Sequence, residues 1–276
     1  MKVSLNTNQS ALVALQNLNA TSSDLTTTEK RISTGLRVTN AKDNGSVWTI
    51  AQKQRSDIGA LDAVRAGIDR ATSIAEVALT AGTNISDLFI QLKAKVVAAT
   101  DSTIDTVSRK LLDQDYRSLI QQITRATKSA EFDGTNLFDG SLTGPLNFLA
   151  DAKASFSITL SAQNLSFGGT IITLASTDSI TTSTLAGTAL TKVQTTIINV
   201  NKALGALGAQ LRQLEAHNLF LSKLTDAVET GIGNLVDADM AKESARLQAL
   251  NVKQELGTQA LSIASRQPQQ ILNLFK

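Results

Sequence analysis

The chain has 276 residues, enough to bury a sizeable core, and its 26 basic and 24 acidic residues leave a formal charge of only +2. With no cysteine and a single histidine, His217, it can build neither a disulfide scaffold nor a zinc site of cysteines and histidines. The near balance of charge gives no electrostatic reason to expect nucleic acid or a membrane as a partner. No apolar run approaches the roughly 20 residues of a membrane span, and the first residues lack the apolar core of a secretory signal, so the residues alone favour a cytosolic protein.

The N-terminal half begins with two predicted helices whose apolar residues recur at steps of 3, 4 or 7. A polar stretch at residues 40–46, rich in turn formers and helix caps, separates the two. The second helix, over about 46–99, would be roughly 80 Å long at 1.5 Å per residue, which indicates a rod rather than a globule. The apolar residues of the first helix are Ala11, Leu15, Leu18, Leu25, Ile32 and Leu36.

The middle of the chain mixes a shorter helix with a small β region. The spacing predicts a helix over about 105–129, followed by two Asp-Gly turns within residues 132–140. Residues 155–161 alternate polar and apolar and predict a half-buried strand, with a second strand at 171–174. Residues 170–196 are rich in serine and threonine and favour strand edges or a solvent-exposed loop rather than a helix.

A heptad repeat between residues 204 and 235 predicts a coiled-coil helix. A single Asn218 in this seam is expected to fix the register of the helix, as polar residues in apolar seams do. The Gly231–Gly233 pair is expected to break the helix. The seam consists of Leu204, Leu207, Leu211, Leu214, Asn218, Leu221, Thr225, Val228, Ile232 and Leu235.

The last predicted helix, over about 239–265, has apolar residues on two opposite faces. Leu247, Leu250 and Leu261 share one face. Because a helix with two apolar faces must be covered on both sides, we expect it to be buried between subunits. The opposite face carries Ala245, Ala249, Val252, Leu256, Ala260 and Ile263.

No set of residues in the sequence supports an active site, a metal site or a cofactor site. The Gly231-Ile232-Gly233 run lacks the third glycine and the preceding strand of a dinucleotide fingerprint. Residues 133–136 begin like a calcium loop, but the glycine in second place and the missing glutamate favour a turn. His217 has no second histidine and is expected to be a solvated or interfacial side chain. The prediction is a protein that is not an enzyme and needs no cofactor.

Several motifs in the two ends and the middle resemble those of bacterial flagellins. They are Asn6-Thr7-Asn8 with Ser10-Ala11-Leu12, residues 31–38 (RISTGLRV), residues 41–44 (AKDN), residues 132–140 (FDGTNLFDG), residues 235–241 (LVDADMA), residues 256–264 (LGTQALSIA) and residues 268–272 (PQQIL). They cover roughly the first 140 and the last 75 residues in the expected order, and the short middle is similar to that of the short flagellins of alphaproteobacteria.

The resemblance implies a mainly α fold with a small β region: a hairpin of long helices, a coiled-coil rod in which the N- and C-terminal helices pair, with a central β-hairpin. Residues 1–43 and 236–276 would form an inner coiled-coil domain. Residues 44–235 would form an outer helical domain with a β region at about 141–190 and no large surface insert. The residues expected at the core of the subunit interface are Leu15, Leu18, Leu25, Ile32, Leu36, Leu247, Leu250, Val252, Leu256, Leu261 and Ile263.

The same resemblance implies an extracellular structural subunit that self-assembles into the flagellar filament for motility. Such a subunit is exported through the flagellar type III channel without a cleaved signal peptide. Its implied partners are further copies of itself, an export chaperone at the C-terminal helix, and the hook-associated junction and cap proteins. Two alternatives stay open, a hook–filament junction protein and an intracellular coiled-coil adaptor.

One segment departs from the pattern of flagellins that activate the vertebrate flagellin receptor. In those members the matching helix segment is rich in arginine and continues with glutamate. Here Ile90 and Leu92 take the places of the arginines, and Lys93 that of the glutamate. The loss of two cations and the reversal of one charge predict a defective receptor epitope.

Overall fold

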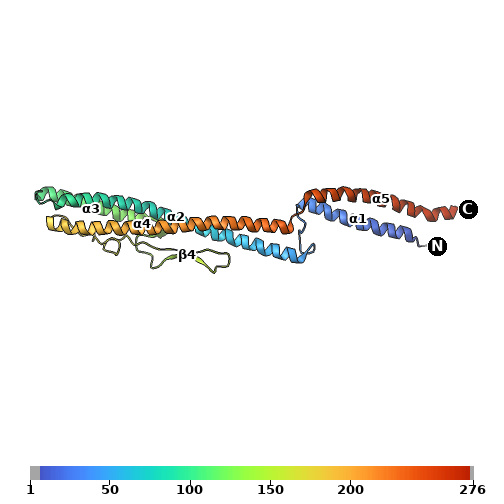
Figure 1. The fold of residues 1–276 in the computed structure, drawn as a ribbon, viewed down its shortest axis with the longest axis horizontal. Coiled ribbons are helices and arrows are strands. Elements are labelled where there is room, and N and C mark those ends of the chain that lie inside the picture. Colours follow the sequence, from blue (N-terminus) through green and yellow to red (C-terminus); the bar gives the residue numbers. More distant parts are fainter. Residues whose placement is uncertain (1–6, 274–276) are drawn as a thin grey trace. The chain divides into compact units, whose positions relative to one another are not determined.

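The computed structural model describes the backbone of residues 7–273 and the side chains of residues 7–266. Asn6 of the first motif and the side chains of residues 268–272 lie outside that range. The described part confirms a mainly helical chain with a small β region (Figure 1). Its elements are α1 (Gln9–Thr34), α2 (Gly45–Thr100), α3 (Thr106–Ser129), β1 (Glu131–Phe132), β2 (Thr135–Asn136), β3 (Leu146–Leu149), β4 (Ser157–Leu160), α4 (Ser183–Val236) and α5 (Met240–Asn273).

The chain divides into two compact units. The first contains residues 1–56 and 227–276, and the second contains residues 57–226. Helices α1 and α5 belong to the first unit, and α3 with both β-hairpins belongs to the second. The long helices α2 and α4 each contribute one part to each unit.

Helix starts follow capping residues that the sequence makes visible. The side chains of Asn8, Asn44, Asp105 and Asp239 accept hydrogen bonds from backbone N–H groups in the first turns of α1, α2, α3 and α5. These acceptors satisfy donors that a helix start leaves unpaired. The predicted helices over 46–99 and 105–129 are confirmed as α2 and α3, and α5 continues past its predicted end to Asn273.

The core of the second unit lies among α2, α3 and α4 and is closed by the segment between β2 and α4. Each large apolar side chain buried there contributes about 1.5–3 kcal/mol relative to exposure. The largest fully buried side chains are Tyr116, Phe89, Phe138, Ile68, Ile85, Leu92, Ile123, Leu137, Leu160, Leu165, Ile172 and Leu174.

The two predicted Asp-Gly turns are present. Asp133 and Gly134 both have positive φ, 48° and 73°, and connect the antiparallel pair β1–β2, as type I′ hairpin turns require. Gly140, with φ 78°, follows Asp139. The buried side chain of Asn136 between them donates to the carbonyl oxygen of Thr127 at the end of α3 (2.9 Å) and accepts from the backbone N–H of Phe138 (2.8 Å). One amide therefore ties the turn to α3.

The predicted strand at 155–161 is confirmed as β4, but the prediction of a second strand at 171–174 is wrong. The partner of β4 is β3, in an antiparallel register that pairs Leu146 with Leu160. Ile172 makes one isolated bridge to Phe167. Ile172 and Leu174 are fully buried because they fill the core among the helices, so burial rather than strand pairing explains their apolar spacing.

The expectation that residues 170–196 avoid a helix is also wrong, because α4 begins at Ser183. Ala186, Ala189 and Val193 recur at steps of 3 and 4 and are buried. The hydroxyls of Thr188, Thr191 and Thr195 donate to carbonyl oxygens four residues earlier. These internal hydrogen bonds satisfy the polar groups within the helix, and tertiary burial outweighs the low helix propensity of threonine.

The predicted helix break at Gly231–Gly233 does not occur, since α4 runs through both glycines to Val236. Ile232 between them is buried. A β carbon at Gly233 would lie 2.7 Å from the Asp237 carboxylate. Glycine at 233 therefore leaves room for the Asp237 carboxylate just after the helix.

Candidate assembly surfaces

Helices α1 and α5 of the first unit lie side by side and run antiparallel (Figure 1). At one end the Asn8 side-chain amide donates to the backbone carbonyl of Ala264 (2.7 Å). At the other end the Arg31 guanidinium lies 3.1 Å from the Glu243 carboxylate. Just after α1, the backbone N–H of Arg37 donates to the carbonyl of Val236 at the end of α4 (2.7 Å).

Each of these two helices has one face that is buried or half-buried, with positions alternating at steps of 3 and 4. This is the spacing of a coiled-coil seam. A β carbon at Gly257 would lie 3.2 Å from Leu18, so glycine permits close approach of the helices there. The face consists of Ala11, Ala14, Leu18, Thr21, Leu25, Thr28 and Ile32 on α1, and of Glu243, Leu247, Leu250, Gln254, Gly257, Leu261 and Ala264 on α5.

The other apolar face of α5 is not covered by the described residues. Val252 is 56% exposed, Leu256 is 58% exposed and Ile263 is 69% exposed. The start of α1 adds three exposed apolar side chains, Leu12, Val13 and Leu15. Single exposed apolar residues are ordinary, but an aligned row along a helix marks a surface for another protein.

The predicted interface residues therefore fall into two groups. Leu18, Leu25, Ile32, Leu247, Leu250 and Leu261 lie on the faces that α1 and α5 turn to the interior of the pair, whereas Leu15, Val252, Leu256 and Ile263 are exposed. Leu36 is half-buried and pairs with Asp237 through an isolated bridge. Their contact with other subunits remains a prediction.

The ion pair between Arg31 and Glu243 was not predicted from the sequence. Glu243 is 7% exposed, and its Oε1 accepts from Arg31, while its Oε2 has no hydrogen-bond partner within the described residues. The available signal was its spacing, since Glu243 lies four residues before Leu247 on the same face. A charged residue at an apolar position of the repeat indicates a partner across the seam.

The α4 seam positions are all buried or half-buried. In the second unit Leu207, Leu214 and Leu221 are buried, and Leu204 and Leu211 are half-buried. In the first unit Ile232 is buried, and Val228 and Leu235 are half-buried. The heptad therefore describes the inward face of α4.

The two polar residues of this region connect α4 to its neighbours in the second unit. The Asn218 side chain donates to the Asp69 carboxylate and accepts from the Arg65 guanidinium (3.1 Å), both on α2. The Nε2 of His217 is hydrogen-bonded to the backbone carbonyl of Ala150 in the β3–β4 connection (2.8 Å). Both interactions hold structural elements together.

The three residues of the altered receptor segment have different environments. Ile90 is 57% exposed and Lys93 is exposed on α2. Leu92 is fully buried among the helices of the second unit. Of these three residues, Ile90 and Lys93 therefore have side chains that a partner of this unit could contact.

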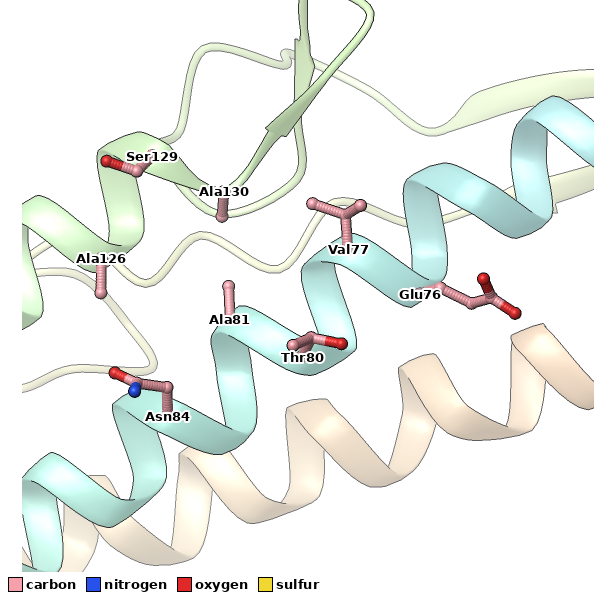
Figure 2. A pocket seen from close by; sticks show the side chains of 8 residues that line it. All are labelled: Glu76, Val77, Thr80, Ala81, Asn84, Ala126, Ser129 and Ala130. Carbon is pink, nitrogen blue, oxygen red and sulfur yellow. The ribbon is translucent and has the colours of Figure 1, made fainter.

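A shallow groove of about 540 Å³ lies between α2 and the end of α3. Figure 2 shows Val77 and Ala81 of α2 directed towards Ala130, whereas the Glu76 carboxylate extends away from α3. The groove is mainly apolar and lacks a nucleophile with an adjacent base.

The described residues contain no cluster of histidine, aspartate and glutamate that could hold a metal ion. Burial, followed by the nearby Asp178 and Asp113 carboxylates, raises the pKa of Tyr116 and keeps its hydroxyl neutral within the core. No helix in the described range is long and apolar enough to cross a membrane.

Comparisons with known proteins find similar sequences along the whole chain and a similar fold over part of it. The bacterial flagellin N-terminal helical region matches residues 5–143, and the bacterial flagellin C-terminal helical region matches residues 190–275. The chain is 49% identical to flagellin FljJ of Caulobacter vibrioides, covering 100% of this chain and 99% of that protein. It is 38% identical to a flagellin of Brucella melitensis, covering 99% of both proteins. In fold it is similar to a solved structure described as a flagellar hook-associated protein of Vibrio parahaemolyticus (TM-score 0.59, 11% identity, covering 71% of this chain and 100% of that one).

Proposed function

The chain belongs to the bacterial flagellin family, and on that premise we propose that it is the structural subunit that self-assembles into the bacterial flagellar filament. It acts by packing against further copies of itself and not by catalysis.

The observation that carries the proposal is the two-faced α5. One face packs on α1 through Leu247, Leu250 and Leu261, and the opposite face exposes Val252, Leu256 and Ile263. Because burial of each such side chain contributes about 1.5–3 kcal/mol, covering the second face strongly favours association. In a homopolymer the neighbouring copies supply that cover.

The test is elongation of filament seeds by the purified chain, followed by electron microscopy. Leu256→Asp and Ile263→Asp should abolish elongation, because each places a charge on the exposed apolar face. Asn251→Asp is the matched control: it adds the same charge at an exposed polar position of α5, and it should elongate seeds like the wild type. Normal elongation by both the Leu256→Asp and the Ile263→Asp variant would contradict the proposal.

The proposal extends to the domain organisation. Residues 1–43 and 236–276 form the inner coiled-coil domain of the assembled filament, and residues 44–235 form the outer domain. The antiparallel α1–α5 pair supports the inner assignment. In filaments, proteases should therefore reach the 137–182 segment of the second unit before α1 or α5.

The proposed partners outside the filament follow from the same surfaces. An export chaperone covers the exposed apolar face of α5 before assembly, and hook-associated junction and cap proteins contact the ends of the filament. The chain reaches the cell exterior through the flagellar export channel without cleavage of a signal peptide. An intact N-terminal Met1 or Lys2 in filaments sheared from cells is the expected result of N-terminal sequencing.

The fold alone does not distinguish a filament subunit from a junction protein. The chain shares its fold with the hook-associated structure although the two sequences are only 11% identical. Sequence identity of 49% to a flagellin along the full chain supports the filament subunit. Quantification of the chain in sheared filaments discriminates between them, since a junction protein is a minor component. An intracellular adaptor would be absent from those filaments.

We also propose that the receptor epitope is defective. Ile90 and Lys93 are exposed on α2 and cannot supply the arginine and glutamate of the recognised pattern. Purified monomer should fail to activate the vertebrate flagellin receptor, and potent activation would refute the proposal.

A further inference from the structure

One face of α3 carries a row of basic and amide side chains along almost the whole helix. The positions recur at steps of 3 and 4, every one of them is exposed, and none is acidic. At 1.5 Å per residue the row is about 27 Å long. This basic row consists of Lys110, Gln114, Arg117, Gln121, Arg125 and Lys128.

One face of α2 in the same unit carries the opposite charge. Its positions also recur at steps of 3 and 4 over about 38 Å, and none is lysine or arginine. All are exposed except the half-buried Ser73. This acidic row consists of Asp62, Ala66, Asp69, Ser73, Glu76, Thr80, Thr83 and Asp87.

The cations that flank the acidic row are engaged by other residues of their own unit. Arg65 donates to Asn218 of α4 (3.1 Å). Arg70 forms an ion pair with Asp133 in the β1–β2 turn (2.9 Å). The charge of Arg70 is therefore compensated outside the row. Arg65 is hydrogen-bonded to a neutral amide and offsets one of the four carboxylates, so the row keeps a net negative charge.

The carboxylates that flank the basic row are engaged in the same way. Asp113 accepts from Arg117 (2.7 Å), from the Ser179 hydroxyl (2.9 Å) and from the backbone N–H of Ile180 (2.8 Å). Asp115 pairs with Lys95 of α2 (2.7 Å). Arg117 is thus satisfied within the unit, and the remaining cations of the row are not.

Six charges of the two rows have neither an ion pair nor a side-chain hydrogen bond within the described residues. They are Lys110, Arg125 and Lys128 in the basic row and Asp62, Glu76 and Asp87 in the acidic row, whereas Asp69 accepts from Asn218. Both rows also border hollows in the surface. Glu76 and Thr80 stand at the groove of Figure 2, and Arg117, Gln121 and Arg125 line a hollow of about 330 Å³.

We propose that in the filament the basic row of one subunit lies against the acidic row of a second copy of the chain. The inference rests on the proposed function. Because the two rows are different surfaces, the contact is head-to-tail rather than two-fold and can repeat without closing. Single exposed ion pairs are weak, so the rows act mainly by steering association and fixing the register between neighbours.

The test compares critical monomer concentrations for elongation of seeds. Lys110→Glu with Arg125→Glu and Lys128→Glu should raise this concentration about tenfold, since three attractive pairs become repulsive. Asp62→Lys with Glu76→Lys and Asp87→Lys should do the same. A chain carrying both sets of reversals should elongate seeds of the same doubly reversed chain as the wild type elongates its own, because the charges are again complementary.

The matched control is Lys202→Glu with Arg212→Glu and Lys223→Glu. It makes the same change in net charge at three exposed positions of α4 and should leave the critical concentration unchanged. Higher ionic strength should raise the wild-type value because salt screens exposed charges. Circular dichroism of each monomer verifies that the helices are retained.

A second measurement does not depend on variants. Filaments grown from isotopically labelled and unlabelled wild-type chains are treated with a carbodiimide, which joins amines to carboxylates in contact. Mixed-isotope links from Lys110 or Lys128 to Asp62, Glu76 or Asp87 are expected. Absence of these links, or failure of the double reversal to restore elongation, overturns the row contact, whereas failure of the wild-type chain to add to seeds overturns the proposed function itself.

Discussion

The guanidinium of Arg109 on α3 closes the C-terminal end of α2 by donating from Nε to the backbone carbonyl of Ala99 (3.1 Å). The same side chain donates to the carbonyl of Asp101 (2.6 Å), and the hydroxyl of Ser183 at the start of α4 donates to the carbonyl of Thr100 (2.9 Å). Helix ends leave carbonyl groups without intrahelical partners. Here α3 and α4 supply the donors, so the end of α2 depends on tertiary structure.

Replacement of Arg109 by leucine should destabilise the second unit. The side chain is 8% exposed, and its loss leaves buried carbonyls unpaired, which costs about 1–3 kcal/mol. Urea denaturation followed by circular dichroism measures the change in the free energy of unfolding. Lys110→Leu, one residue further at an exposed position, is the control, and equal stability of the two variants would contradict the capping role.

Replacement by alanine should affect stability differently at Gly82 and at Gly59. A β carbon at Gly82 would overlap the Leu204 side chain and lie 3.2 Å from Phe138, whereas nothing lies within 4 Å of one at Gly59. Gly59→Ala should raise the free energy of unfolding by about 0.5–1 kcal/mol through helix propensity. Gly82→Ala should lower it or leave it unchanged, because Leu204 must move out of its packed position.

A double-mutant cycle separates this steric effect from propensity. In a Leu204→Ala background the overlap disappears, so Gly82→Ala should cost less than it costs in the wild type. Thermal unfolding of the four proteins gives the coupling. An equal cost in both backgrounds would show that Leu204 is not the obstacle.

The turn before α2 should show a pH-dependent contribution from Asp43. Its carboxylate accepts from the Thr39 hydroxyl (2.6 Å) and backbone N–H (3.0 Å). The Thr39 hydroxyl, followed by the Thr39 backbone, lowers the pKa of Asp43 from 3.8 to about 2. Since the folded-state pKa is depressed, the stabilisation is present above pH 3.8 and is lost as the pH falls through about 2.

Carboxyl-carbon NMR checks this assignment. Thr39→Val should raise the pKa of Asp43 towards 3.8. Lys30→Ala should change it less, because the ammonium lies 3.6 Å away and is the smallest of the named causes. A larger shift for Lys30→Ala than for Thr39→Val would reverse the order of the causes.

The α1–α5 pair should be the first part of the monomer to be cleaved by protease. Within its described side chains only Leu25 and Thr28 of α1 and Glu243 and Leu250 of α5 are buried. This burial is too small to compensate for the conformational entropy that is lost when the two helices become ordered. Limited proteolysis should remove about forty residues from each end and leave a folded body that no longer elongates seeds. Ends as resistant in the monomer as in filaments would contradict this expectation.

Much of the helical architecture was predictable from the sequence because its signals are local. Asn44 and Asp105 cap α2 and α3 where the sequence places turn formers, and the heptad from Leu204 marks the inward face of α4. The two apolar faces of α5 were also visible, since helical periodicity depends only on spacing.

Where local propensity and burial favour different conformations, the tertiary structure determined which conformation the segment adopts. Threonine-rich residues after Ser183 form a helix because Ala186 and Val193 are buried, and Ile172 fills a core instead of pairing in a strand. The glycines at 231 and 233 stay helical for the same reason, with Ile232 buried between them.

The partners of individual side chains were equally beyond the sequence. No spacing rule links Arg31 to Glu243 or Arg109 to Ala99, because these contacts join residues on different helices. Periodicity fixes which residues of a helix share a face, but the other elements of the fold decide which face is covered. The sequence therefore determined that α5 has two apolar faces, and only the packing of α1 decided that Leu250 is buried while Leu256 stays exposed.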